Sequence, residues 1–176
     1  RHPCVVHRQH RRARASLAGQ PVLFAHRYIT RPVRGDENFV ALSAAEFDLR
    51  LQRDLFAMHW QAHGASYGIG REIDLWRRAG CLVVVSGSRA HFLAELAHDP
   101  DITPILVTAP PDVLARRLRA RGRDDEASIA ERLTRSGSFA IAHSRLIEMR
   151  NDAAIADAAR ILSGALGNCL QATAPG

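Results

Sequence analysis

The chain has 176 residues, 47% of them hydrophobic, which suits one domain with a substantial apolar core. Its apolar runs are far shorter than the roughly 20 residues of a membrane-spanning helix. The basic stretch 1–20 has no apolar centre, so we expect neither a membrane partner nor a signal peptide. The three cysteines show no metal-type spacing and no disulfide framework, which favours a cytoplasmic location.

Predicted strands and helices alternate along the chain. Apolar runs predict strands at 22–25 leading into 29–30, at 81–86 and at 102–109. Helices are predicted at 43–56, 71–79, 90–97, 111–121, 129–147 with a break near 136–138, and 152–166. Ser43 and Glu46 form a capping box at the start of the first helix. The alternation predicts an α/β fold with a mainly parallel sheet flanked by helices.

The net charge is +6, and every basic residue is an arginine. Replacement of all lysines by arginine fits a GC-rich genome. A basic chain can also bind nucleic acid, but the arginines are not interleaved with the aromatic residues that stacking on bases needs. They concentrate in the segments 8–14, 27–34 and 116–123. A small anionic substrate explains the last two clusters better, so we expect no nucleic-acid partner.

Two of these arginine clusters have the form of phosphate-binding segments. One is the strand end HRYITRPVR at 26–34, and the other is RRLRARGRDDEASIAERL at 116–133. The planar guanidinium group of arginine binds phosphate oxygens in a bidentate way. An ordinary solvated helix with ion pairs is the alternative for the second segment.

The order and spacing of these segments resemble the guanylate kinase-like family. Its T-T-R-x-x-R turn, which holds the acceptor phosphate, is matched from Ile29 through Thr30 and Arg31 to Arg34. Its Y-G pair is matched by Tyr67-Gly68. Its lid arginines are matched by Arg117, Arg121 and Arg132. The resemblance implies a P-loop kinase fold with an arginine-rich lid, in which these three arginines close over the transferring phosphate and Thr30, Arg31, Arg34 and Tyr67 bind the acceptor.

Two departures from the guanylate kinase pattern concern the acceptor. Where that family has carboxylates that bind guanine, this chain has His59 before Trp60, and Ser86 in the segment Ser86-Gly87-Ser88-Arg89. Without those carboxylates the guanine donors lose their partners, at about 1–3 kcal/mol each if buried. The segments HWQAHGASYG and GSRAH resemble PhnN-type ribose 1,5-bisphosphate phosphokinases. That resemblance implies a sugar phosphate as acceptor, ATP with its Mg²⁺ as donor, and 5-phosphoribosyl 1-diphosphate as product, in phosphonate breakdown.

The part of the sequence that should bind the phosphate donor, ATP, departs from the family pattern. The sequence contains no G-x-x-x-x-G-K-[ST] phosphate loop, and no glycine precedes Gly19. We therefore expect the first strand and the phosphate loop to be absent, with an atypical basic segment at 1–15, the kinase domain at 16–167 and a loose tail at 168–176. A misread or damaged N-terminus is one explanation. A pseudokinase that lost donor binding is the other. The alternative function is therefore a non-catalytic relative that binds a phosphorylated ligand, and a guanylate-type kinase is the third candidate function.

Two weaker signals complete the set of candidate residues. His59 and His63 have the spacing of metal ligands on a helix, but no third ligand is evident, so no metal site is predicted. Asn151-Asp152 resembles the adenine-side turn of the family. Equally, Asp152 suits the N-cap of the last helix.

Overall fold

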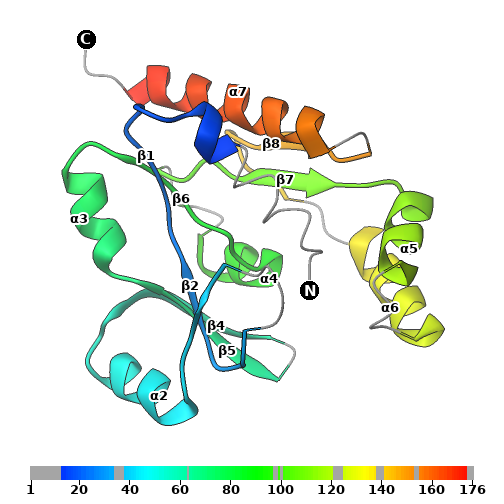
Figure 1. Ribbon diagram of the computed structural model, residues 1–176, viewed down its shortest axis with the longest axis horizontal. Helices are drawn as coiled ribbons and strands as arrows, with labels where there is room; N and C mark the ends of the chain where they lie inside the picture. The colour runs from blue at the N-terminus through cyan, green and yellow to red at the C-terminus, as the bar shows by residue number, and fades with distance from the viewer. Residues whose placement is uncertain are drawn as a thin grey trace.

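The computed structural model describes residues 13–33, 38–62, 64–96, 99, 101–120, 125–137, 141–152 and 155–173 (Figure 1). These residues form an α/β fold, as the sequence predicts. No helix in these ranges is long and apolar enough to cross a membrane. Arg34, Arg121 and most of the predicted basic segment 1–15 lie outside the described residues.

Two pairs of parallel strands lie beneath the C-terminal helix α7 (Ile155–Thr173) (Figure 1). β1 (Val22–Phe24) pairs with β6 (Leu82–Val84), and β7 (Ile105–Thr108) pairs with β8 (Ile147–Arg150). Both strand pairs and α7 contribute to one apolar core. The buried residues of this core are Ala13, Val22, Phe24, Met149, Leu162 and Leu166. Among the described residues no strand joins β6 to β7.

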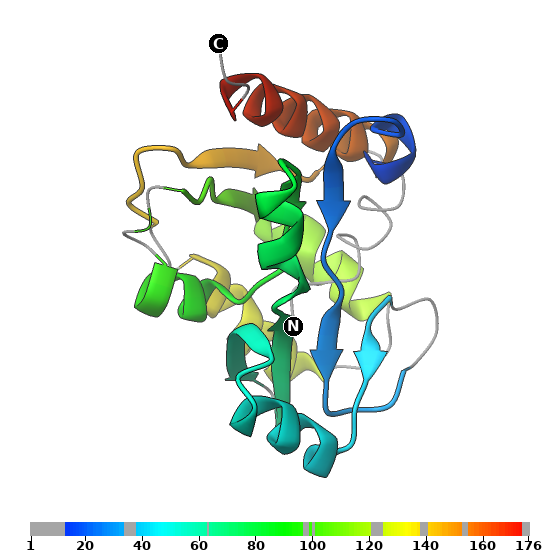
Figure 2. The same ribbon diagram turned by 90° about the vertical axis from the view of Figure 1, so that its left-hand side faces the viewer.

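A separate four-stranded sheet, in the order β3-β2-β5-β4, lies at the far end of the molecule from α7 (Figure 2). Its strands are β2 (Arg27–Ile29), β3 (Val40–Ala41), β4 (Phe56–Ala62) and β5 (Ala65–Gly70). β5 is antiparallel to both β2 and β4, whereas β2 and β3 are parallel. The predicted parallel strands are present in the pairs β1–β6 and β7–β8, and this antiparallel sheet is an addition to them. The hairpin β4–β5 was not predicted, because its glycines and serine resemble a loop.

One face of this sheet is covered by helix α2 (Ala44–Gln52). Ser43 caps the helix by accepting a hydrogen bond from the Glu46 N–H at 3.1 Å, which confirms the Ser43 half of the predicted capping box. The Glu46 carboxylate binds Arg50 at 2.7 Å. Phe47 of α2 packs against Phe56 of β4, with ring centroids 4.6 Å apart. The Phe56 ring lies over Gly68, where an added Cβ would come within 2.5 Å of it. Only glycine fits at this position of β5.

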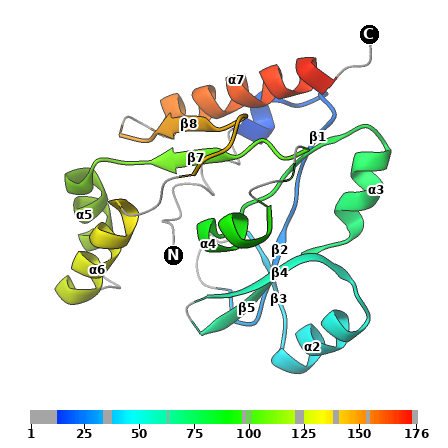
Figure 3. The ribbon, with the colours of Figure 1, turned by 180° about the vertical axis from the view of Figure 1, so that it is seen from behind.

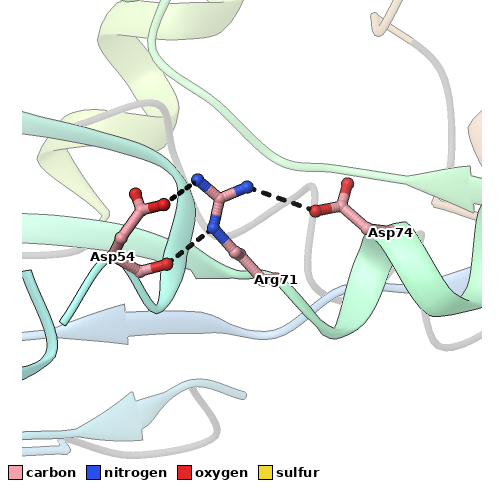
Figure 4. A network of polar contacts seen from close by, with 3 residues as sticks. All are labelled: Asp54, Arg71 and Asp74. Atoms are coloured by element: carbon pink, nitrogen blue, oxygen red, sulfur yellow. Dashed lines mark hydrogen bonds and ion pairs between the residues drawn. The ribbon is translucent and has the colours of Figure 1, made fainter.

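An ion-pair cluster holds the connections around the hairpin (Figure 4). Arg71 binds the Asp54 carboxylate at 2.5 Å and donates to the Asp54 carbonyl oxygen at 2.6 Å. A weaker contact of 3.5 Å joins Arg71 to Asp74 in helix α3 (Glu72–Arg78). Hydrogen bonding to Asp54 raises the pKa of Arg71. The cluster fixes the start of β4 against the end of β5.

The lid helices α5 (Pro111–Arg119) and α6 (Glu126–Gly137) lie together at one side, remote from α2 and α3 (Figure 3). Ala115, Leu118 and Ile129 form their shared core. The predicted helix 129–147 stops at its expected break, because α6 ends at Gly137. The described residues 141–146 after the break are not helical, and strand β8 begins at Ile147. Met149 is 1% exposed, so this strand is drawn into the core beside β7.

Two predicted domain boundaries change. Ala13, placed in the atypical segment 1–15, is fully buried in the core, so the packed domain begins before residue 16. The tail predicted from residue 168 is helical through Thr173. Leu162, Leu166 and Leu170 of α7 pack on the core. Their burial outweighs the cost of about 1 kcal/mol for Gly167 in a helix.

Candidate functional site

The strand register divides the four-stranded sheet into two faces. Directly paired residues of neighbouring antiparallel strands point to the same face. Ile29, Tyr67 and Trp60 form one such row. Tyr28, Gly68 and His59 form the next row and therefore point to the opposite face. Helix α2 covers the face with Tyr28, so the face with Tyr67 is the candidate acceptor site.

Tyr67 and Trp60 form an aromatic platform on the acceptor face. Their rings are nearly parallel, with an interplanar angle of 6° and centroids 5.4 Å apart. Tyr67 is 6% exposed and packs with Ile29 and Phe39, while Trp60 is half-buried. The guanidinium of Arg27 lies 6.0 Å from the centroid of the Tyr67 ring. Two rigid rings with a cation beside them are thus held by the sheet itself.

The predicted phosphate turn follows directly from β2. Thr30 is tied to β5 twice: its N–H donates to the Ser66 carbonyl at 3.1 Å, and its Oγ1 accepts from the Ser66 N–H at 2.8 Å. Arg31 follows, with its guanidinium 4.5 Å from the centroid of the Phe39 ring. Thr30 therefore anchors the turn, and Arg31 lies beside the platform residues. Arg34 belongs to the same predicted turn but is outside the described residues.

The segment after β6 faces the acceptor sheet from the other side. Ser86 lies in the loop 85–88, and Arg89 is the first residue of the short helix α4 (Arg89–His91). Burial lowers the pKa of the Arg89 guanidinium. His91 stacks on Trp60, with ring centroids 5.4 Å apart. This contact brings the segment that carries Ser86 and Arg89 against the acceptor face.

His59 does not join this group. Its strand partner is Gly68, on the face opposite Tyr67, and its side chain is exposed. The structure thus gives no support to a shared ligand for His59 and Tyr67. Trp60 occupies the place beside Tyr67 instead.

The lid is connected to the strand β8 by Arg117. Its Nη1 donates to the carbonyl oxygen of Asn151 at 2.7 Å. Arg132 lies on α6, which packs against α5, but nothing is described of its side chain. Arg119 and Glu126 form a bidentate ion pair across the two helices at 2.8 and 2.9 Å, which lowers the pKa of Glu126. Part of the lid therefore does have the ion-paired character that the alternative interpretation predicts.

Asn151 and Asp152 have different environments at the end of β8. The Asn151 N–H donates to the Thr108 carbonyl at 2.7 Å, and the residue is only 5% exposed. Its Oδ1 is buried and makes no hydrogen bond within the described part of the chain. A hollow of about 290 Å³ lies nearby, lined by residues 108–111 and Arg150. Asp152 pairs with Arg150 and lies three residues before α7, so its role as N-cap stays a prediction.

The comparisons with known proteins agree on one family. No family model matches the sequence. The ribose 1,5-bisphosphate phosphokinase PhnN of Desulfomicrobium baculatum is 48% identical over 154 residues, which cover 86% of this chain and 82% of that protein. The PhnN protein of Thiobacillus denitrificans is 52% identical over 145 residues, covering 81% of this chain and 76% of that protein. This chain belongs to the PhnN family of phosphokinases.

The PhnN assignment agrees with the fold. The guanylate kinase of Anaplasma phagocytophilum superposes on 92% of this chain with a TM-score of 0.58 and 16% sequence identity. Eighty per cent of that chain is covered, and the likeness shows the shared kinase fold. The sequence resemblance to guanylate kinase-like proteins, and to the PhnN type among them, is thereby confirmed.

Three residues at the PhnN acceptor face were not among the predicted site residues: Arg27, Trp60 and His91. Arg27 is the second residue of the motif HRYITR and His91 is the last residue of GSRAH, so both residues stand within the quoted motifs. In the sequence, Trp60 is named only as the neighbour of His59. Its partner Tyr67 was identified, and the strand pairing of β4 with β5 is the information that was missing.

Proposed function

We propose that this chain transfers the γ-phosphoryl group of ATP to ribose 1,5-bisphosphate, giving 5-phosphoribosyl 1-diphosphate and ADP. The bond between the γ-phosphorus and the β,γ-bridging oxygen breaks, and a bond to an oxygen of the acceptor's 1-phosphate forms. The observation that carries the proposal is the acceptor face with Tyr67, Trp60 and Arg31, opposed by the Ser86–Arg89 segment. The relatives of this chain are named ribose 1,5-bisphosphate phosphokinase.

The proposed roles of the residues follow from the negative charge on the reacting phosphates. The nucleophile is a phosphate oxygen, so no strong general base is required, and catalysis rests on positioning and neutralisation of charge. Arg31, Arg34 and Tyr67 would bind the acceptor. Arg117, Arg121 and Arg132 would close over the transferring group, with Asn151 and Asp152 beside the nucleotide.

Magnesium would enter as part of the ATP complex. Among the described residues no group of three or more His, Cys, Asp or Glu side chains is arranged to hold a metal ion. Mg²⁺ bound with ATP would neutralise part of the charge on the phosphates. The buried Oδ1 of Asn151 is an acceptor that suits an N–H or amino group of the nucleotide.

A base-free acceptor is favoured over GMP. Ser86 stands where a guanine-binding carboxylate is expected, and His59 points to the other face of the sheet. The neighbouring space on the acceptor face holds the stacked pair Trp60 and His91. These features provide no carboxylate for the donor groups of guanine.

We further propose that phosphoryl transfer is impaired in the printed sequence. A phosphate loop supplies backbone N–H groups, a lysine for the β- and γ-phosphates, and a hydroxyl for Mg²⁺. The 176 residues contain neither the loop motif nor a lysine. The chain would then bind the acceptor without phosphorylating it. The second candidate function, a non-catalytic protein that binds a phosphorylated ligand, requires the same behaviour.

A turnover assay tests the reaction and its impairment together. The chain as printed is compared with a fusion in which a strand, glycine loop and lysine of a PhnN relative replace residues 1–14. Formation of 5-phosphoribosyl 1-diphosphate is followed by phosphorus NMR. We expect product from the fusion and little or none from the printed chain. An ordinary kinase rate of about 1–100 per second from the printed chain would overturn the impairment. No product from a well-folded fusion that binds ATP would overturn the reaction.

A further inference from the structure

A single turn of π-helix follows the short helix that contacts the acceptor face. Helix α4 continues directly into the π-turn η1 (Phe92–Leu96). Turns of this kind are rare and occur frequently at functional sites. A π-turn contains one residue more than an α-turn, so its conversion to α-helix would rotate the residues before it by about 100° relative to those after it. The contacts around η1 therefore decide where the side chains of α4 point.

One side chain, His143, contacts both ends of η1. Its ring lies edge-on to that of Phe92, the first residue of η1, with ring centroids 6.0 Å apart. Its Nε2 donates to the carbonyl oxygen of Asp99 at 3.4 Å, and the Asp99 N–H donates to the carbonyl oxygen of Leu96, the last residue of η1, at 3.1 Å. Its Nδ1 accepts a hydrogen bond from the Arg145 N–H at 3.1 Å. These partners place the ring proton on Nε2 and fix the orientation of the ring.

The two neighbours of η1 are the return from the lid and the acceptor face. His143 belongs to the described segment 141–146, which lies between the lid helix α6 and strand β8. His91, the residue before Phe92, stacks on Trp60 at 5.4 Å. Two adjacent residues thus connect the return from the lid to the aromatic platform.

We infer that His143 is a positioning residue for the acceptor site, because it holds η1 in the π form and so keeps the segment 86–91 against Trp60. The consequence for acceptor binding rests on the proposed function. Without His143, η1 would relax toward the commoner α form, and His91 would turn away from Trp60. Movement of the loop 141–146 would release the same contacts, so the position of the lid and the affinity for the acceptor are coupled.

Quenching of tryptophan emission by acrylamide tests the positioning itself. The chain has two tryptophans, so Trp76→Phe leaves Trp60 as the only one. In this background His91→Ala removes the stacking directly and sets the full effect. His143→Leu should raise the quenching constant of Trp60 toward the value for His91→Ala. Ser144→Ala, at the exposed next position of the same loop, is the matched control and should leave the constant unchanged.

Two partial variants separate the contacts that His143 makes. His143→Phe keeps an aromatic edge against Phe92 and loses both hydrogen bonds, whereas His143→Gln keeps a donor for Asp99 and loses the ring. Both should give quenching between that of the unmodified chain and that of His143→Leu, and they replace the leucine variant if it melts below the assay temperature. Quenching that stays at the unmodified value in the His143 variants would overturn the inference. So would a His91→Ala variant in which Trp60 is unaffected.

Calorimetry with ribose 1,5-bisphosphate tests the consequence for the acceptor. We expect His143→Leu to weaken binding at least about fivefold, the lower end of ordinary coupling between sites, and Ser144→Ala to leave it unchanged. An unchanged affinity in a variant whose Trp60 quenching has risen would overturn the role in acceptor binding. If the unmodified chain does not bind ribose 1,5-bisphosphate, the proposed function fails, whereas the quenching result still decides whether His143 holds η1.

Discussion

Arg117 donates a hydrogen bond from its Nη1 to the carbonyl oxygen of Asn151 at 2.7 Å, so the lid helix α5 is tied to the end of strand β8. Arg117 was predicted to act on the transferring phosphate. Its position shows that the same side chain also links the lid to the parallel strands. A guanidinium has five N–H donors, so one contact with a carbonyl leaves donors for a phosphate.

Loss of Arg117 should destabilise the fold more than loss of its neighbour Arg119. The partly buried hydrogen bond of Arg117 has a charged donor, worth about 1.5–3 kcal/mol. The ion pair of Arg119 with Glu126 is exposed, and such pairs contribute about 0–1 kcal/mol. Arg117→Ala should therefore lower the melting temperature by several degrees and Arg119→Ala by little, as measured by circular dichroism. Equal shifts would show that the contact with Asn151 contributes nothing to stability.

Substitution of Arg31 should weaken acceptor binding while leaving most of the stability intact. Arg31→Ala removes a charged phosphate contact, which costs about 1.5–3 kcal/mol of binding free energy. It also removes the contact with the Phe39 ring, worth about 0.5–1 kcal/mol of stability. Calorimetry with ribose 1,5-bisphosphate and thermal melting measure the two effects. A variant that binds normally but melts much earlier would make Arg31 a structural residue only.

Two glycine substitutions should have opposite effects on stability. Gly68→Ala places a Cβ 2.5 Å from the Phe56 ring and should destabilise by about 1–3 kcal/mol. Gly164 is exposed in α7 with no atom within 4 Å of an added Cβ. Gly164→Ala should therefore stabilise by up to about 1 kcal/mol through helix propensity. Denaturant unfolding measures both, and a neutral Gly68→Ala would contradict the packing of Phe56 over β5.

Tyr28 should ionise above the ordinary range for tyrosine. Burial raises its pKa above 10.0, and the nearby Glu72 carboxylate adds to the effect. Because the fold favours the neutral phenol, this group does not affect stability well below pH 10 but destabilises the fold as the pH rises past that value. Tyr28→Phe should abolish this alkaline loss of stability and remove a tyrosine transition above pH 10 from an ultraviolet titration. If the tyrosine transition that Tyr28→Phe removes lies at or below pH 10, the assignment is wrong.

The sequence predicted the elements whose signals are local. The helix cap at Ser43, the apolar strands at 82–84 and 105–108, and the helix opened by Pro111 are all present. Each depends on residues within a few positions of one another. The same holds for the motifs that identify the family, which are short and retain their spacing.

Features that depend on strand pairing were not predictable in this way. The hairpin of β4 and β5 contains Gly64, Gly68 and Gly70, which weaken any strand pattern. Its register decides that Trp60, and not His59, lies beside Tyr67. Strand β8 was not predicted, because Met149 acquires its burial only from β7 and α7.

The central claim is that the acceptor face binds a base-free bisphosphate, and one calorimetric comparison tests it most directly. Ribose 1,5-bisphosphate and GMP are titrated separately into the printed chain without ATP. The account predicts binding of ribose 1,5-bisphosphate and no detectable binding of GMP, because Ser86, Trp60 and His91 offer no carboxylate to guanine. Tight binding of GMP, without binding of ribose 1,5-bisphosphate, would contradict it.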